Sequence, residues 1–385
     1  MYIVRNRTAK NGLAAIENNL AALRQRRGLS ASSLARIVGT SRQSIYAMEA
    51  GNYLPNTAVA LRLAQVLDVS VEELFTLPGT RQFERTRPEH AVILPESSAP
   101  RPGQPVQLCR VGKLLFASTP PPIPWYLPPS DAIIAGTVSD GRRANVRAYQ
   151  PETGFRNRIL VAGCDPAISI LARHVQLAGV ELVIAHRNSS QALSLLKQRC
   201  IHVAGTHLRD ESSGGSNIAV ITRMFSTNSV AVISFAVWDE GLLTASGNPK
   251  GIRGVEDLAR KDVAIVNREP GAGSRALLDS QLARAGIGAK RVRGYNGLAS
   301  GHLPAAWQVQ AGMVDCCVAT RAAARAFGLG FISLASERYD LAIRRSHLDM
   351  PQIPVLLDTL SRAGFRRELE GTGGYDMRTA GTRML

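Results

Sequence analysis

An alternation of apolar runs and helical stretches beyond Arg158 constrains the fold of this chain more than any other feature. Short apolar runs such as RILVAG, VELVIAH and VAIVN are separated by stretches with helical spacing, such as SQALSLLKQR and SRALLDSQLARAG. This alternation predicts parallel sheets with covering helices. Because roughly 230 residues are many for one sheet, we expect two α/β lobes in residues 158–385.

Residues 11–78 follow a different pattern, in which short helices succeed one another with hardly an extended segment. Ser30, Ser41 and Asn56 stand as N-caps before apolar positions at helical spacing, while Gly39 and Gly51 mark helix ends. The fourth helix is expected to carry Leu61, Leu63, Ala64 and Leu67. Five helices in so short a segment predict a small all-α domain.

Residues 79–157, between these two parts, are rich in proline. The stretch TRPEHAVILPESSAPRPGQP is typical of a linker, and STPPPIPWYLPP concentrates proline again. The segments VQLCRVGKLLFAS and DAIIAGTVSD alternate well enough to predict strands. We therefore expect a multidomain protein: an all-α domain at 11–78, a linker and small β-rich connector at 79–157, and a two-lobed α/β domain at 158–385.

Composition narrows the class of protein. A formal net charge of +16 favours polyanionic partners such as nucleic acid. The N-terminal MYIVRNRTAKNG has no apolar segment behind its basic residues, and no stretch approaches a membrane span, so neither secretion nor a membrane partner is expected. Five scattered cysteines without a CxxC pair suggest reduced thiols in the cytoplasm rather than a zinc site, with Cys316 and Cys317 buried in a strand.

The stretch LRQRRGLSASSLARIVGTSRQSIYAMEAGNYLPNTAVALRLAQVLDVSVEELF resembles the helix-turn-helix of the Xre and Cro/C1-type repressors. In that family the second helix of the motif lies in the major groove, and its first residues touch base edges. Arg42 can donate two hydrogen bonds to guanine, and Gln43 can both donate to and accept from adenine. Phosphate or sugar contacts are expected nearby, with charge from Arg24 and Arg26. The resemblance thus assigns DNA contact to Arg27, Ser41, Arg42, Gln43, Ser44, Tyr46 and Asn52. The alternative is that these side chains only cover an exposed helix face in contact with solvent.

Several stretches beyond Arg158 resemble the periplasmic-binding-protein-like domain related to molybdate and tungstate binding proteins. They include VAGCDPAISILARHV, HVAGTHL, GNPKGIRGVEDLARKDVAIVNREPGAGSRALLDSQLARAGI and the terminal GTGGYDMRTAG. That domain also occurs behind cytoplasmic helix-turn-helix modules. The resemblance implies a small oxyanion bound between two lobes, with no further cofactor.

The segment VAIVNREPGAGSRALLD predicts a strand, a glycine-containing loop and a helix start. Unpaired backbone N–H groups at a helix start favour an anion. Gly271 and Gly273 would let the backbone approach it, while Ser274 and either Arg268 or Arg275 would donate hydrogen bonds. The alternative is a glycine turn with a helix-capping serine.

A second helix start, GCDPAI, is expected to form the opposite lip of the site. Asp165 would repel a dianion, so it either points away as an N-cap or faces a protonated or different ligand. His302 matches a histidine expected in the family, although a structural cap explains it equally well. The candidate ligand residues are Cys164, Asp165, Thr206, His207, Asn267, Arg268, Gly271, Gly273, Ser274, Arg275, Ser300 and His302.

The function expected from these features is that of a cytoplasmic, ligand-responsive transcription regulator. It would bind double-stranded operator DNA as a homodimer. The expected ligands, in order of preference, are molybdate, tungstate, another tetrahedral anion and a small cofactor-like molecule. One alternative is a regulator whose α/β domain only dimerises. An enzyme is disfavoured, because there is no Ser-His-Asp arrangement, HExxH pair or nucleotide fingerprint.

Overall fold

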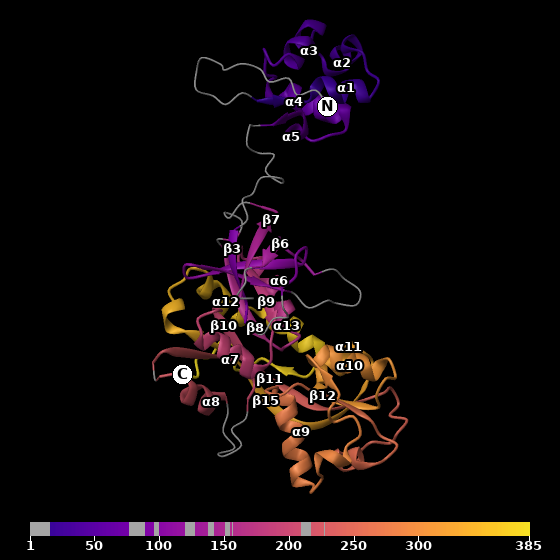
Figure 1. Ribbon diagram of the computed structural model, residues 1–385, viewed down its shortest axis with the longest axis vertical. Coiled ribbons are helices and arrows are strands. Elements are labelled where there is room, and N and C mark those ends of the chain that lie inside the picture. Colours follow the sequence, from indigo (N-terminus) through magenta and orange to yellow (C-terminus); the bar gives the residue numbers. More distant parts are fainter. Residues whose placement is uncertain are drawn as a thin grey trace. The chain divides into compact units, whose positions relative to one another are not determined.

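A computed structural model describes residues 16–76, 89–95, 100–119, 128–137, 142–150, 155, 157–208, 217–226 and 228–385. The chain divides into two compact units, Met1–Arg87 and Pro88–Leu385 (Figure 1). Most of STPPPIPWYLPP lies outside the described residues, whereas most of the predicted linker TRPEHAVILPESSAPRPGQP is described, and its residues Glu89–Ile93 form a strand rather than a linker. Among the described residues, no helix is long and apolar enough to cross a membrane.

The first unit is the predicted all-α domain. Its elements are β1 (Glu17–Asn18), α1 (Leu20–Arg26), α2 (Ala31–Val38), α3 (Arg42–Glu49), α4 (Thr57–Leu67), α5 (Val71–Leu74) and β2 (Phe75–Thr76). Ser30, Ser41 and Asn56 cap α2, α3 and α4 by accepting backbone N–H groups, as expected. Gly39 ends α2 with a φ of 76°, which favours glycine. Leu61 differs from the expectation: it is 57% exposed, because it lies outside the buried face of α4, which is formed by Ala60, Leu63, Ala64 and Leu67.

The second unit begins with a closed barrel, which is the predicted β-rich connector. Its strands, in the spatial order β3-β5-β4-β6-β7, are β3 (Glu89–Ile93), β4 (Pro105–Val111), β5 (Leu114–Ser118), β6 (Ala132–Thr137) and β7 (Arg143–Ala148). One apolar face of the barrel, including Cys109 and Phe116, packs against Leu160 of the α/β part. Arg158 adds an ion pair to Asp131 at 2.7 Å and a hydrogen bond to the Leu108 carbonyl at 2.9 Å. The barrel and the α/β part therefore share a core.

The α/β part is built on one mixed sheet. Its strand order is β13-β12-β14-β11-β15-β10-β8-β9, with β16 beside β11. The strands are β8 (Arg158–Gly163), β9 (Glu181–His186), β10 (Val203–Thr206), β11 (Val230–Thr244), β12 (Ile265–Arg268), β13 (Leu298–Ala299), β14 (Cys316–Thr320), β15 (Gly330–Arg344) and β16 (Tyr375–Asp376). Cys316 and Cys317 are buried in β14, as predicted. All five cysteines are free and buried.

The expectation of parallel strands is wrong for the centre of this sheet. The pairs β8–β9, β8–β10, β12–β13 and β12–β14 are parallel, but β11 pairs antiparallel with β14 and β15, and β15 with β10. β11 and β15 are each 15 residues long and take part in both halves of the sheet. Since the chain crosses to the second lobe in β11 and returns in β15, these two strands must run in opposite directions.

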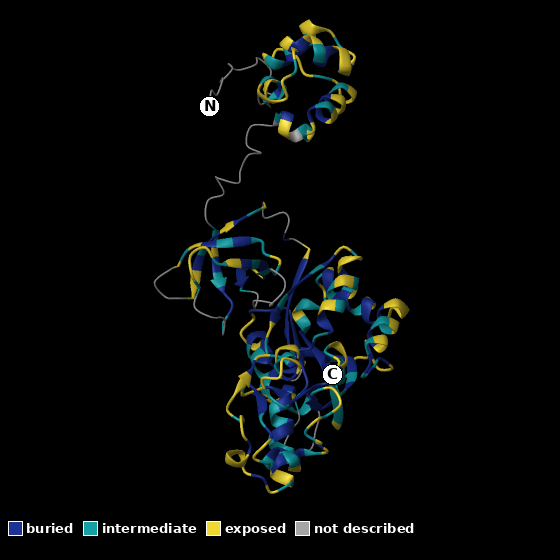
Figure 2. Ribbon diagram, turned by 90° about the vertical axis from the view of Figure 1, so that its right-hand side faces the viewer, coloured by how far each residue is buried: buried dark blue, intermediate teal, exposed yellow. Residues whose placement is uncertain are grey.

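Helices cover both faces of the sheet and divide it into two lobes. They are α6 (Ile168–Gln176), α7 (Ser189–Lys197), α8 (Asn217–Met224), α9 (Gly273–Arg284), α10 (His302–Gln310), α11 (Arg321–Ala326), α12 (Gln352–Ser361) and α13 (Ala363–Thr372). In the first lobe, α6, α12 and α13 cover one face, while α7, α8 and the barrel cover the other. In the second lobe, α9 packs on one face, and α10 and α11 pack on the other. Most strand positions between these layers are buried, whereas the first half of β15 is only partly buried (Figure 2).

Candidate functional site

In the first unit, α3 presents its first turn to solvent. Ser41, Arg42 and Gln43 are exposed, and Ser44 is half-buried beneath the cap that its backbone N–H makes with Ser41. The Arg42 guanidinium lies 5.3 Å from the centre of the Tyr46 ring and 3.3 Å from its hydroxyl. α3 therefore presents a guanidinium, an amide and hydroxyls on one exposed turn.

The basic residues around α3 differ in their availability. Arg24 does not supply free charge, because it pairs with Glu49 and the two side chains are only 11% and 10% exposed. Arg27 is exposed and pairs with Asp68 at 2.9 Å, and solvent screens this ion pair. Arg26 and Asn52 are exposed.

In the second unit, the two lobes touch at the start of α9. The Ser190 backbone N–H donates to the Gly271 carbonyl at 3.4 Å, and the Asn188 amide donates to the Pro270 carbonyl at 3.2 Å. A Cβ atom on Gly273 would lie 2.5 Å from the His207 ring, so glycine is what lets the second lobe approach this closely. The lobes are thus closed on each other.

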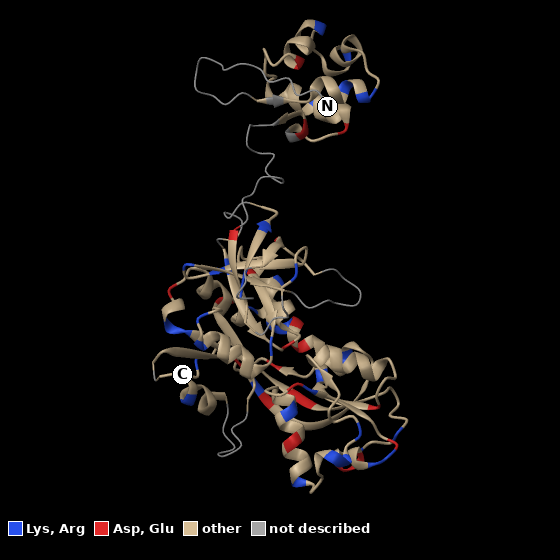
Figure 3. Ribbon diagram, in the orientation of Figure 1, with Lys and Arg blue, Asp and Glu red and all other residues tan. Residues whose placement is uncertain are grey.

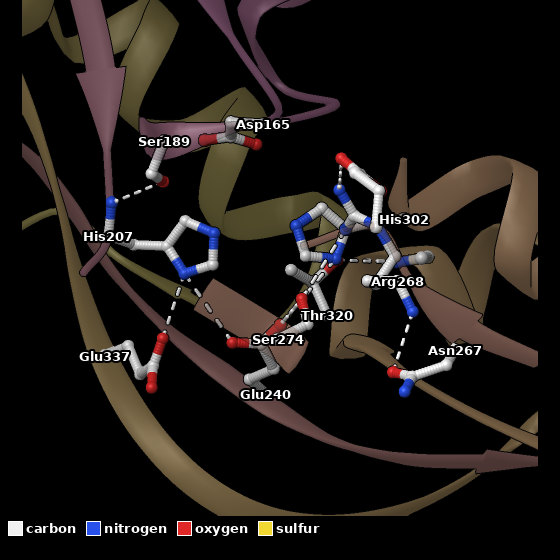
Figure 4. A network of polar contacts seen from close by, with 12 residues as sticks. Asp165, Ser189, His207, Glu240, Asn267, Arg268, Ser274, His302, Thr320 and Glu337 are labelled. Carbon is white, nitrogen blue, oxygen red and sulfur yellow. Dashed lines mark hydrogen bonds and ion pairs between the residues drawn. The ribbon is translucent and has the colours of Figure 1, made fainter. Parts of the chain in front are cut away.

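Two histidines and two glutamates meet beneath this contact (Figure 4). His207 Nδ1 lies 3.0 Å from Glu337 Oε2 and 3.7 Å from Glu240 Oε2, while His302 Nδ1 lies 3.8 Å from Glu240 Oε1. The two rings are 5.8 Å apart, and the Ser274 hydroxyl donates to Glu240. We call His207, His302, Glu240 and Glu337, together with Cys164, the interlobe cluster.

Burial sets the protonation of the cluster. Burial, reinforced by the charge of Glu337, raises the pKa of Glu240 to about 8. Burial alone would lower the pKa of His207, but Cys164, Glu337 and Glu240 together raise it well above its usual range. Burial and the charge of Arg268 hold the pKa of His302 well below its usual range. His302 is therefore neutral at physiological pH.

Several buried polar atoms of this region have no hydrogen bond among the described residues. They are both ring nitrogens of His302, Nε2 of His207, Oε2 of Glu240 and Oδ2 of the neighbouring Asp165. Leaving a buried polar atom unsatisfied costs about 1–3 kcal/mol, so such atoms seldom gather without a ligand to satisfy them.

The structure brings part of the predicted ligand set together. The N-cap residue of α6 is Ala167, so Asp165 is not the predicted N-cap: it accepts from the Ala167 backbone N–H at 2.8 Å in the turn before the helix and from the Tyr375 hydroxyl at 2.6 Å. Its burial raises its pKa to about 6. Arg268 is buried, lies 3.5 Å from Ser274 and pairs with Glu269. The predicted residues that lie in or beside the interlobe cluster are Cys164, Asp165, His207, Arg268, Gly271, Gly273, Ser274 and His302.

Other predicted residues turn away. Arg275 donates to the Arg268 carbonyl and stacks over Tyr295, outside the cluster. Ser300 is exposed. Thr206 faces Asn217, and the Asn267 side chain bonds to the Tyr295 carbonyl and the Arg268 backbone N–H.

Sequence reasoning did not identify Glu240 and Glu337. Glu240 interrupts the interior of β11 and Glu337 that of β15; acidic positions along the strands of the α/β part are red in Figure 3. A buried glutamate in a central strand is rare without a partner. That interruption was the available signal.

Comparisons with known proteins agree with this architecture. Residues 20–74 match the family described as helix-turn-helix, and residues 172–361 match the family described as a PBP superfamily domain. The chain is 28% identical over 245 residues to the uncharacterized protein YvgK of Bacillus subtilis, covering 63% of this chain and 79% of that protein. It is 34% identical over 62 residues to the uncharacterized HTH-type transcriptional regulator YgzD of the same organism, covering 16% of this chain and 94% of that protein. Among solved structures, the sulfate-binding protein SubI from Mycobacterium tuberculosis is similar with a TM-score of 0.43 and 16% identity, over 57% of this chain and 86% of that one.

Proposed function

The chain belongs to the helix-turn-helix transcriptional regulators and carries a PBP superfamily domain, and from this premise we propose that it regulates transcription in response to a small ligand. Residues 20–74 would bind double-stranded operator DNA in the cytoplasm. A ligand held between the lobes would set the geometry of a DNA-binding homodimer. The interlobe cluster carries this proposal, because unsatisfied polar atoms from both lobes face one another there.

The exposed first turn of α3 supports the DNA-binding half of the proposal. Arg42 and Gln43 are solvent-exposed at the position from which this motif reads base edges. Arg27 lies in a different helix-end segment, where its charge would contact phosphate. Base reading by α3 and phosphate contact by Arg27 can be separated by experiment.

For the ligand, the resemblance favours molybdate first and tungstate second. Arg268 and the unpaired N–H groups at the start of α9 would favour such an anion. The buried carboxyl groups of Asp165, Glu240 and Glu337 oppose it unless they are protonated. The raised pKa of Glu240 allows that proton near neutral pH.

A DNA-binding assay with the full chain tests the proposal. An operator is first selected from random double-stranded DNA, and its affinity is then titrated with and without molybdate or tungstate. We expect the effective anion to change operator affinity by about 5- to 150-fold, the usual range of coupling between two sites. If no DNA sequence is enriched, the chain is not a sequence-specific regulator.

Variants of the predicted anion contacts locate the response. The double variant Arg268→Gln and Ser274→Ala should lose the response to the anion while keeping ligand-free DNA binding, because residues 20–74 have their own core. Arg275→Ala is the matched control, since Arg275 lies outside the cluster and should leave the response intact. An operator affinity that neither anion changes would refute the oxyanion.

A further inference from the structure

Three potential metal ligands converge where the two lobes meet. Cys164 follows β8, His207 follows β10 and His302 begins α10. Each places one ligand atom within 4.8 Å of the ligand atoms of the other two, and all three side chains are buried. Separate segments of the chain therefore bring a sulfur and two imidazole nitrogens to one point.

The histidines are prepared for a further partner. Within the part of the chain that the structure describes, neither ring nitrogen of His302 has a hydrogen-bond partner, and nor does Nε2 of His207. Glu337 Oε2 accepts a hydrogen bond from Nδ1–H of His207 at 3.0 Å, so Nε2 would offer its lone pair to a metal ion that displaces its proton. A carboxylate on the second nitrogen of a metal-binding histidine is the usual device that orients the ring and increases its basicity.

The charge around these atoms favours a cation. Three buried carboxyl groups, those of Asp165, Glu240 and Glu337, stand near the two rings. Arg268, which is buried beside the cluster, is already paired with Glu269 at 3.1 Å. Because a buried charge is costly unless it is compensated, a divalent cation would compensate these carboxyl groups once they lose their protons, whereas a dianion would add to their charge.

The kinds of atom present select the class of cation. Thiolate sulfur and imidazole nitrogen suit Zn²⁺ and Co²⁺, whereas Mg²⁺ and Ca²⁺ prefer oxygen ligands. Three protein ligands leave one position of a tetrahedral site for water or a small molecule.

We propose that Cys164, His207 and His302 form a binding site for a transition-metal cation of the zinc type. Cys164 and His207 belong to the first lobe and His302 to the second, so the bound metal joins the lobes. The inference rests on the proposed function, because it names the ligand class of the same interlobe cluster. A cation at this cluster would take the place of the proposed oxyanion. Metal binding and the response of operator affinity to molybdate, measured separately, distinguish the two ligands.

Cobalt is the probe, because Co²⁺ takes the place of Zn²⁺ and is visible by absorption. The full chain, stripped with a chelator, is titrated with Co²⁺. We expect one Co²⁺ per chain and a thiolate-to-cobalt charge-transfer band. Cys164→Ser should abolish the band, whereas Cys200→Ser should keep it, since Cys200 is equally buried at 7% but lies outside the cluster.

Two further variants test the histidines. His302→Gln should weaken Zn²⁺ binding by at least roughly tenfold in competition with a chromophoric chelator, and Glu337→Gln should weaken it by roughly 10- to 100-fold. His174→Gln is the matched control, because His174 pairs with Glu368 outside the cluster and should leave the affinity unchanged. Circular dichroism checks that each variant is folded, and Cys164→Ala takes the place of Cys164→Ser if that variant does not fold.

The proposed metal site fails if the unaltered chain binds no Co²⁺, shows no thiolate band, or keeps the band in a folded Cys164→Ser variant. Operator binding is measured separately. Metal binding that leaves operator affinity unchanged would support the site and overturn its role in regulation. A response of the operator to molybdate in metal-free protein would support the proposed function and overturn the cation.

Discussion

Replacing Gly273 with alanine should open the two lobes. A Cβ atom at this position would lie 2.5 Å from His207 Cε1, 2.6 Å from Nδ1 and 2.6 Å from the His207 carbonyl oxygen, whereas ordinary contacts begin at 3.4 Å. The imidazole ring could rotate only by disturbing its contact with Glu337. The carbonyl oxygen is backbone and cannot rotate away, so the start of α9 must move off the first lobe.

The cost follows from the contacts involved. Inserting a methyl group into a packed region costs about 1–3 kcal/mol. Separating the lobes to avoid that cost loses the Ser190–Gly271 and Asn188–Pro270 hydrogen bonds, at about 1 kcal/mol each. Whether the clash is retained or the lobes separate, the closed form is destabilised by roughly 1–3 kcal/mol relative to the open form. The ratio of open to closed molecules therefore rises by about 5- to 150-fold.

Hydrogen exchange of the full chain measures this change. The Ser190 amide lies in the first turn of α7, where N–H groups have no partner within the helix, and it donates across the lobes to Gly271. Its exchange should be faster in Gly273→Ala by up to the same factor. Gly288→Ala is the control, because its φ of −73° and open surroundings accept a methyl group. Unchanged exchange at Ser190 together with unchanged unfolding stability would refute the reasoning.

Four further substitutions test other parts of the molecule. Arg42→Ala should weaken operator binding by about 1–3 kcal/mol and random DNA less, as measured by anisotropy; equal losses would mark a phosphate contact. Arg27→Ala should weaken binding to all sequences and reduce the salt slope by about 1, and an unchanged slope would count against it. Arg158→Met should destabilise the second unit by about 3–5 kcal/mol in denaturant unfolding, because it leaves the largely buried Asp131 carboxylate unpaired; a loss below about 1 kcal/mol would contradict this. Burial, with a smaller contribution from a neighbouring histidine, lowers the pKa of His202 to about 3. The neutral His202 side chain therefore contributes to folding stability above pH 6.5, and this contribution falls by about 1.4 kcal/mol per pH unit as the pH drops from 6.5 towards 3. Unfolding at several pH values should show this component in the unaltered chain and not in His202→Gln.

The helix starts of the first unit could be predicted because capping is local. Ser30, Ser41 and Asn56 each accept a backbone N–H three residues further on, so the pattern that predicts the cap contains every atom that makes it. The left-handed Gly39 follows from the same local geometry. The exposure of Leu61 depends on which face of α4 meets the other helices, and the pattern of apolar residues left that open.

Strand direction was harder to predict. The run AVISFAV indicates a strand, but β11 continues through Trp238, Asp239 and Glu240 to Thr244, because the strands beside it supply partners for its backbone. The antiparallel pairing of β11 with β15 joins segments about a hundred residues apart in the chain. Hydrophobic periodicity identifies strands, not their partners.

The sequence by itself determined the local elements, the change from helices to alternating strands and helices, and the exposed chemistry of α3. It also placed Cys164, His207 and His302 in loops after strands or at helix starts. Only the tertiary structure decided that these three lie within 4.8 Å of one another, that Glu337 holds Nδ1 of His207, and that Arg275 turns away. The physical reason is that capping and periodicity depend on neighbours in the chain, whereas the interlobe cluster depends on strand order and lobe closure, which bring together residues that no sequence spacing connects.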